Sequence, residues 1–411
     1  EQANALSQGA GFIDPMMWPH LSYQAAHHPP LYTVFLAAAS VVGLDTPDAH
    51  RVLSCVAGAA AIALVGVLGR RLAGPRSGLL AAGLAAVYPN LWLNDGLVLS
   101  ESLYAPLVAG VLILSYSFLD RPDFKRAAGL GALLALVALT RAEALNLMVF
   151  LVVPLVYSAV RPHWRRGVAL LAVIGATSAL VVAPWIGHNL ERFYRPVYLS
   201  VGASGVLPSA NCDETYDGPL LGYWSARCTF PNPQAVSELF KAHPDERRLA
   251  RQGRRLLGGG DESVFAEQNL ERGMDYVRAH KGRAVVVAAA RVGRIWDLYR
   301  PGQAVTLNNV IEGRPKAAAM LGLVLYYELL ALGVLGLVVL HRRKVSILPF
   351  VSLAILVTVT AAVAIGLNRY RTPVEVALVV LGGVALDAIL RWARPAKKRA
   401  PTPEEPVGAD G

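Results

Sequence analysis

Long apolar runs separated by short basic loops are the feature that most constrains the fold of this chain. A helix needs about 20 mostly apolar residues to cross a bilayer, somewhat fewer where flanking side chains reach the headgroups. Of the 411 residues, 54% are hydrophobic and only 17% are charged, which excludes a soluble globular protein of this length. The sequence therefore predicts an all-α polytopic membrane protein with about nine transmembrane helices, at residues 52–70, 77–93, 97–119, 127–140, 143–160, 167–187, 316–340, 345–366 and 373–391.

The basic residues predict the orientation of this bundle. With nine spans, five basic clusters fall on one face, and loops rich in Lys and Arg stay in the cytoplasm. These clusters are Arg70, Arg71 and Arg76; Arg121, Lys125 and Arg126; Arg161, Arg165 and Arg166; His341, Arg342, Arg343 and Lys344; and the basic tail 392–411. The sequence thus predicts a multi-pass cell-membrane protein whose tail is a disordered cytoplasmic end. The formal net charge of +10 is read as this membrane bias, and no nucleic-acid partner is expected.

The remaining polar segments then lie on the extracytoplasmic face. Residues 1–51 form a first outer loop, in which the short apolar stretch 31–43 is expected to be an interfacial helix. A long outer loop, 188–315, separates transmembrane helices in 52–187 from those in 316–391, and its stretch 283–299 predicts a helix on the outer surface. An outer N-terminal segment also requires one further span upstream of Glu1.

Two cysteines lie in the long outer loop. Cys212 and Cys228 bracket a short segment in a compartment that favours disulfides, so we expect them to be bonded, with two free thiols as the alternative. The chain has no Gly-rich phosphate loop and no CxxC or HExxH motif.

Charged and titratable side chains collect at the outer ends of the spans. Glu101 lies just inside a span, where a carboxylate is costly unless it is paired or faces a wet cavity. Arg141 and Glu143 could simply pair across a tight turn, and arginines near 369–371 could reach lipid headgroups. Because several loops bring such groups to one face, the sequence predicts an extracytoplasmic cavity that handles an anionic, lipid-borne substrate.

A set of short motifs follows in order along nearly the whole chain. They are Gly9-x-Gly11-Phe12, His28-Pro29-Pro30-Leu31-Tyr32, His50-Arg51-Val52, Ser100-Glu101-Ser102-Leu103, Thr140-Arg141-Ala142-Glu143, Pro184-Trp185 with Asn189, and Arg369-Tyr370-Arg371-x-Pro373. Each motif alone is weak, but the ordered set resembles the family-39-type GT-C glycosyltransferases, which include protein O-mannosyltransferases and the lipid A aminoarabinose and galacturonic acid transferases.

The resemblance implies transfer of a sugar, with inversion, from a polyprenyl-phosphate donor to a lipid, glycan or protein acceptor on the outer face. It places the general-base Asp upstream of Glu1, so the chain as printed is expected to lack that residue. Glu101 and His28 are the expected catalytic residues. The expected substrate-binding residues are His27, Tyr32, Arg141, Asn189, Arg369, Tyr370 and Arg371.

No cofactor is expected, and a divalent metal held by His27, His28 and Glu101 is a weaker alternative. Two other functions remain open at this point. A secondary transporter would place charges near the bilayer midplane and show internal repeats, which the sequence does not display. A non-catalytic scaffold that binds a partner through its outer loop would tolerate replacement of the polar residues. The oligomeric state is not predicted.

Overall fold

The structure is a computed structural model that describes residues 1–14, 24–229 and 261–393. Within these ranges it is helical, and the only β-type pairing is a single bridge between Ile13 and Gln24. The expectation of a disordered tail concerns residues that lie mostly outside this part of the chain.

In the described part of the chain, six helices are long and apolar enough to cross a membrane. Three predicted spans are shorter helices instead, so the count of nine spans stays a prediction. The six are α3 (Pro47–Ala73), α6 (Glu101–Asp120), the Ala142–Val160 helix, α9 (Trp164–Arg192), α18 (Lys316–Arg342) and α20 (Thr372–Trp392) with the preceding turn; α4 (Pro75–Val87), α7 (Phe124–Ala138) and α19 (Leu348–Val363) are shorter.

Two predicted spans have different boundaries in the structure. The span predicted at 77–93 breaks between α4 and α5 (Pro89–Gly96), because Pro89 removes an N–H and keeps Tyr88 extended at ψ 108°. The next span begins at Glu101 rather than at residue 97, since Val98 has a left-handed backbone with φ 55°. Both breaks place polar residues at helix ends.

The Ala142–Val160 helix is irregular over its first half. It begins as the 3₁₀ turn η1 (Ala142–Asn146), continues as the π turn η2 (Met148–Val152), and becomes regular in α8 (Val153–Val160). This segment starts directly after Arg141.

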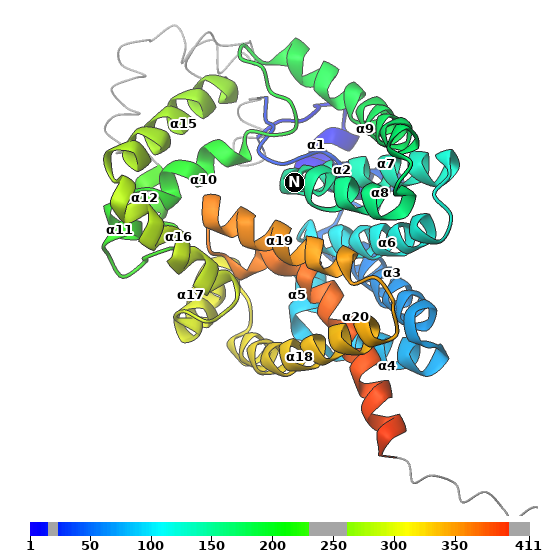
Figure 1. Ribbon diagram of the computed structural model, residues 1–411. Coiled ribbons are helices and arrows are strands. Elements are labelled where there is room, and N and C mark those ends of the chain that lie inside the picture. The colour runs from blue at the N-terminus through cyan, green and yellow to red at the C-terminus, as the bar shows by residue number, and fades with distance from the viewer. Residues whose placement is uncertain (15–23, 230–260, 394–411) are drawn as a thin grey trace, which may run out of the picture.

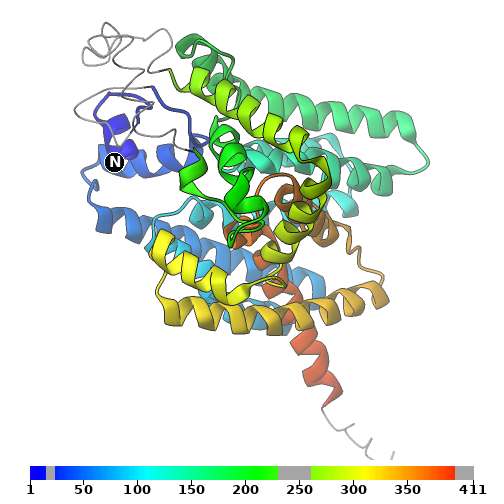
Figure 2. The same cartoon turned by 90° about the vertical axis from the view of Figure 1, so that its left-hand side faces the viewer.

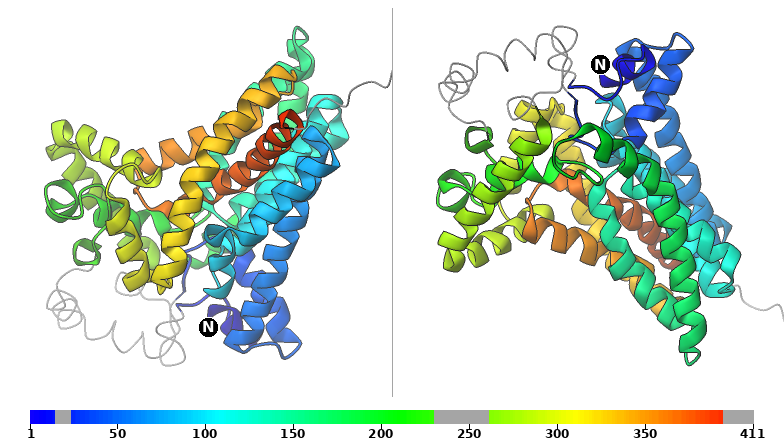
Figure 3. Two further views of the ribbon diagram at one scale, coloured as in Figure 1. Left: turned by 90° about the horizontal axis from the view of Figure 1, so that it is seen from below. Right: turned by 90° about the horizontal axis from the view of Figure 1, so that it is seen from above.

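Helix α20 is the centre of the bundle. Its apolar window is 78% buried, against 61% or less for the other long helices. Figure 3 shows it between α18 on one side and α3 and α4 on the other. Close approach depends on glycine: a Cβ at Gly383 would lie 2.6 Å from the backbone nitrogen of Ala81, and one at Gly336 would lie 2.3 Å from the carbonyl oxygen of Leu381.

The segment predicted as the long outer loop forms a layer of helices at one end of the bundle, which we call the outer layer. These are α10 (Gly202–Ala210), α11 (Asp213–Tyr216), α12 (Ala226–Thr229), α15 (Glu262–Ala279), α16 (Lys281–Ile295) and α17 (Pro301–Glu312). They lie on the left in Figure 1, whereas the basic loops after α3, α6, α8 and α18 lie at the opposite side. Figure 2 shows α17 beside the first turns of α18. A disulfide joins Cys212 to Cys228, the pair expected from the sequence.

Helix α16 differs from the surface helix predicted at 283–299. Arg291 and Arg294 are 4% and 2% exposed, and they point into the protein instead of outward. Arg291 Nη2 donates to the carbonyl oxygen of Ala210, and Arg294 Nε donates to that of Leu221 at 2.6 Å. Burial lowers the pKa of Arg294 to about 10. These arginines join α16 to the other segments of the loop, whereas Val285 and Val286 of the same helix are exposed, so the position of α16 on the outer surface stays a prediction.

The first outer segment is fixed to the bundle at several points. Leu31, the first residue of α2 (Leu31–Val41), donates its N–H to the carbonyl oxygen of Leu139 at 2.9 Å. Arg192 donates to the carbonyl oxygens of Phe12 and Ala25 at 2.9 and 2.8 Å. The His27-His28-Pro29-Pro30 stretch therefore enters α2 beside the turn that carries Arg141.

Candidate functional site

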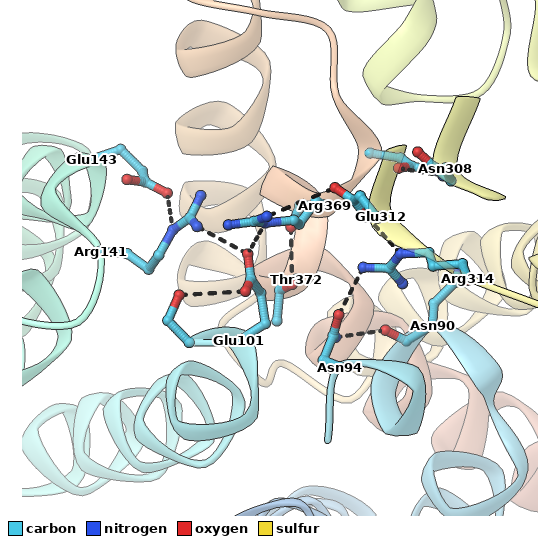
Figure 4. A network of polar contacts seen from close by, with 12 residues as sticks. Asn90, Asn94, Glu101, Arg141, Glu143, Asn308, Glu312, Arg314, Arg369 and Thr372 are labelled. Atoms are coloured by element: carbon cyan, nitrogen blue, oxygen red, sulfur yellow. Dashed lines mark hydrogen bonds and ion pairs between the residues drawn. The ribbon is translucent and has the colours of Figure 1, made fainter. Parts of the chain in front are cut away.

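Glu101 is the central residue of a network of polar side chains at the ends of the helices that face the outer layer. As the first residue of α6 it is only 1% exposed, so its charge needs partners. Arg141 Nη1 donates to its Oε1 at 2.9 Å, and Arg369 Nε donates to the same oxygen at 2.6 Å. Figure 4 shows the two guanidiniums converging on this carboxylate from different elements. The structure thus brings together three residues that the sequence placed in the site.

Three residues that the sequence analysis did not assign to the site extend this arrangement. Glu312 Oε1 lies 3.7 Å from Arg369 Nη1, and Arg314 Nε donates to Glu312 Oε2 at 2.6 Å. Arg314 Nη2 then donates to Asn94 Oδ1 at 2.9 Å. Glu312 and Arg314 lie just before the first residue of α18, a predicted span. This position at the end of a span is the local signal that could have identified them. Asn94 lies within α5, so it does not cap the start of a helix.

On the other side, Arg141 Nε donates to Glu143 Oε1 at 2.8 Å. We call the six alternating residues the charge chain: Glu143, Arg141, Glu101, Arg369, Glu312 and Arg314. Acidic and basic members are equal in number, so their charges balance. Arg369, at 21% side-chain exposure, and Glu143, at 20%, are its most accessible members.

Arg371 is not part of the charge chain. Its side chain is fully buried, and its Nε donates to Glu375 Oε1 at 2.6 Å while Nη1 donates to Asp297 Oδ2 at 2.8 Å. The guanidinium also stacks 3.5 Å from the centre of the Tyr326 ring. The resemblance assigned this residue to substrate binding, but the structure gives its charge to two carboxylates and leaves it no exposed surface.

The two histidines have different surroundings. Desolvation by the surrounding protein and the guanidiniums of Arg141 and Arg369 lower the pKa of His28 to about 4, so its ring is neutral, although part of its surface stays accessible to solvent. His27 is paired through Nδ1 with Glu262, the first residue of α15, and this hydrogen bond raises the pKa of His27. His28 therefore offers a neutral imidazole next to the charge chain, while His27 ties the first outer segment to the outer layer.

The other predicted binding residues have structural partners. Tyr32 shares a hydrogen bond with Ser54 at 2.8 Å, and burial raises its pKa to about 12. Asn189 is 0% exposed and accepts hydrogen bonds from Arg192. Tyr370 lies under Arg141, whose guanidinium carbon is 4.4 Å from the ring centre. Of these three, only Tyr370 contacts the charge chain.

The site offers hydrogen-bond donors and a neutral imidazole, without a cluster of metal ligands. Among the residues described, no three or more His, Cys, Asp or Glu side chains lie close enough to hold an ion. Glu101 is engaged by two guanidiniums, so it suits a role in positioning them better than one in accepting a proton. The general-base Asp expected upstream of Glu1 remains a prediction.

Comparison with known proteins bears on residues 27–188, which match the family model for dolichyl-phosphate-mannose-protein mannosyltransferase. The matched segment includes Glu101, Arg141 and both histidines, and it supports the resemblance to GT-C transferases predicted from the sequence. A comparison with curated protein sequences finds no significant match.

The fold is similar to that of a solved GT-C glycosyltransferase. The archaeal oligosaccharyltransferase AglB from Archaeoglobus fulgidus, in complex with an inhibitory peptide and a dolichol-phosphate, aligns at 17% identity with a TM-score of 0.50. The alignment covers 95% of this chain and 46% of AglB, so the chain spans about half the length of that protein. ArnT from Cupriavidus metallidurans, bound to undecaprenyl phosphate, aligns at 14% identity over 94% of this chain and 72% of ArnT, with a TM-score of 0.35. The AglB alignment shows a shared polytopic helical fold.

Proposed function

We propose that this chain is a GT-C-type membrane glycosyltransferase that moves a sugar from a polyprenyl-phosphate donor to an acceptor on the extracytoplasmic face. The observation that carries the proposal is the charge chain. It gathers Glu101, Arg141 and Arg369 at the end of the bundle opposite the basic loops, and two of these three lie in the segment that matches the mannosyltransferase family. The dolichyl-phosphate-mannose donor in the name of that family and the dolichol-phosphate bound to AglB support a lipid-phosphate donor.

Arg369 is the proposed contact for the donor phosphate. Its Nε donates to Glu101, but its side chain keeps 21% exposure, and among the described residues its other side-chain ion-pair contact is the 3.7 Å one with Glu312. A guanidinium has five N–H donors; Nε supplies one to Glu101 and Nη1 faces Glu312, so at least the two donors of Nη2 remain for a phosphate oxygen. As the bond to the sugar breaks, the leaving phosphate gains charge, and a donor already held in place stabilises that charge without rearrangement.

Glu101 and His28 have supporting roles in this proposal. Glu101 fixes the direction of both Arg141 and Arg369 through one oxygen atom. The neutral imidazole of His28 can donate or accept a hydrogen bond at the donor or acceptor. The carboxylate that deprotonates the acceptor would be the Asp expected upstream of Glu1, as the resemblance implies.

The test is transfer of radiolabelled sugar from a panel of polyprenyl-phosphate sugars, using membranes that contain the full-length protein. We expect Arg369→Ala to lower transfer at least about 100-fold, the scale seen when one preorganised donor is removed. Arg121→Ala is the matched control, because Arg121 is exposed at the far end of α6. If Arg369→Ala retains the transfer activity of the wild type, Arg369 is not part of the site. Absence of transfer with every donor would favour the non-catalytic scaffold.

A further inference from the structure

A small polar cavity lies beside the charge chain and has no assigned role. It has a volume of about 30 Å³ and is bounded by α5, α17, the start of α18 and the turn η3 (Asn368–Arg371). Asn94, Arg314 and Arg369 border it on the side of the charge chain, and Arg371 and Asp297 border it on the other. The cavity therefore lies between the two groups of charges.

Three buried polar atoms on residues lining this cavity have no hydrogen-bond partner among the described residues. They are Arg371 Nη2, Asp297 Oδ1 and Asn308 Oδ1. Their residues are 0%, 2% and 4% exposed, so bulk water does not reach them. A buried polar atom without a partner is costly, and such atoms in folded proteins usually bind ordered water or a ligand. Three of them at one cavity indicate that it is occupied.

The chemistry of the lining selects the occupant. An anion is disfavoured by Asp297 and Glu375, and a cation by Arg371 and Arg314. The unsatisfied atoms comprise one donor and two acceptors, which a molecule that both donates and accepts can satisfy. A water needs roughly 10–15 Å³ of this kind of volume, so the cavity has room for about two.

We propose that this cavity is an internal hydration site whose water completes the hydrogen bonding of Arg371, Asp297 and Asn308 and thereby positions Arg369. The hydration itself is independent of the proposed function; its effect on transfer rests on that function.

The turn η3 connects the water to Arg369. Asn308 Nδ2 donates to Asn368 Oδ1 at 3.1 Å, at the start of the turn. Arg371, at its end, is bound to Asp297 and Glu375. Arg369 lies between these two anchors on the same turn and points to Glu101. Because water joins both anchors, its loss would release the turn and move the guanidinium that we assign to the donor phosphate.

The direct test is a density map of the full chain in a lipid nanodisc, at a resolution that shows ordered water. We expect density within hydrogen-bond distance, about 2.7–3.2 Å, of at least two of the three atoms. A well-resolved map in which the cavity holds no density would overturn the proposal, whether or not the protein transfers sugar. Density in a protein that shows no transfer would leave the hydration site standing and reject only the proposed function.

The functional test uses Asn308→Leu, which removes the acceptor and fills the space, and Asn308→Ser, which keeps a polar atom and leaves room for water. Thr306→Val, on the exposed side of α17, is the matched control. With donor in excess, we expect the kcat of Asn308→Leu to fall at least about tenfold, since small displacements of a positioned group have effects of this size or larger. The kcat of Asn308→Ser should remain within about threefold of the wild-type value. Melting temperatures of all three variants establish that they are folded. A folded Asn308→Leu protein with the kcat of Thr306→Val would refute the positioning role.

Discussion

Replacing Glu101 by Gln tests the charge chain most directly. The substitution keeps the size of the side chain and removes its charge, leaving Arg141 with Glu143 alone and Arg369 with Glu312 at 3.7 Å. Removing one partner of a buried ion pair costs about 3–5 kcal/mol. Glu101 is 1% exposed, but both guanidiniums retain a second carboxylate, so we expect the lower end, about 3 kcal/mol.

The assay is a double-mutant cycle on purified protein in nanodiscs, with denaturant unfolding of Glu101→Gln, Arg141→Gln and the double variant. Because the two residues are in direct contact, we expect the double variant to lose less than the sum of the single losses, by about 1–3 kcal/mol. Glu143→Gln is the control, since Glu143 is 20% exposed with one arginine partner and should cost about 1 kcal/mol or less. Additive losses, or a Glu101→Gln protein as stable as Glu143→Gln, would refute the view that Glu101 is the central residue of the network.

Two further predictions concern the outer layer and the bundle core. The bond to Glu262 raises the pKa of His27, so its stabilisation is complete below the unfolded pKa of about 6.5 and is lost as pH rises through the folded pKa. At about pH 5.5 the melting temperature of the wild type should therefore exceed that of Glu262→Gln, by an amount that corresponds to at most about 1 kcal/mol, and near pH 9 the two melting temperatures should be equal. An equal difference in melting temperature at both pH values would exclude a contribution from His27 titration. Gly383→Ala should destabilise the protein by about 1–3 kcal/mol, because the new Cβ would meet the backbone of Ala81, whereas Gly83→Ala, with nothing within 4 Å, should be neutral or slightly stabilising in the same unfolding assay.

Hydropathy was sufficient to predict the long helices, because apolar length is a local property. The predicted spans 52–70, 167–187 and 316–340 lie inside α3, α9 and α18. The break before Pro89 also had a local cause that the sequence contained, but the apolar run around it concealed the break. The bend at Val98 had no such signal, since a left-handed backbone is uncommon at valine.

Partners of charged residues were much harder to predict. The resemblance named Glu101, Arg141 and Arg369 as site residues, and the structure joins them by hydrogen bonds although Glu101 and Arg369 are 268 residues apart. That resemblance favoured Arg371 over Arg369 as the contact for the donor phosphate, although the two arginines lie on one turn and have the same chemistry. Their difference depends on Asp297, which is 74 residues from Arg371 and was placed by the sequence at the end of a surface helix.

The central position of α20 has a consequence for how the protein is made. Ribosomes deliver α3, α4, α6 and α18 to the membrane before α20, yet all of them pack against it. Until residues 372–392 enter, these helices surround a gap, and Glu101 lacks the arginine that precedes α20. Insertion of α20 therefore fills the centre of the bundle and brings Glu101 its second arginine in one event.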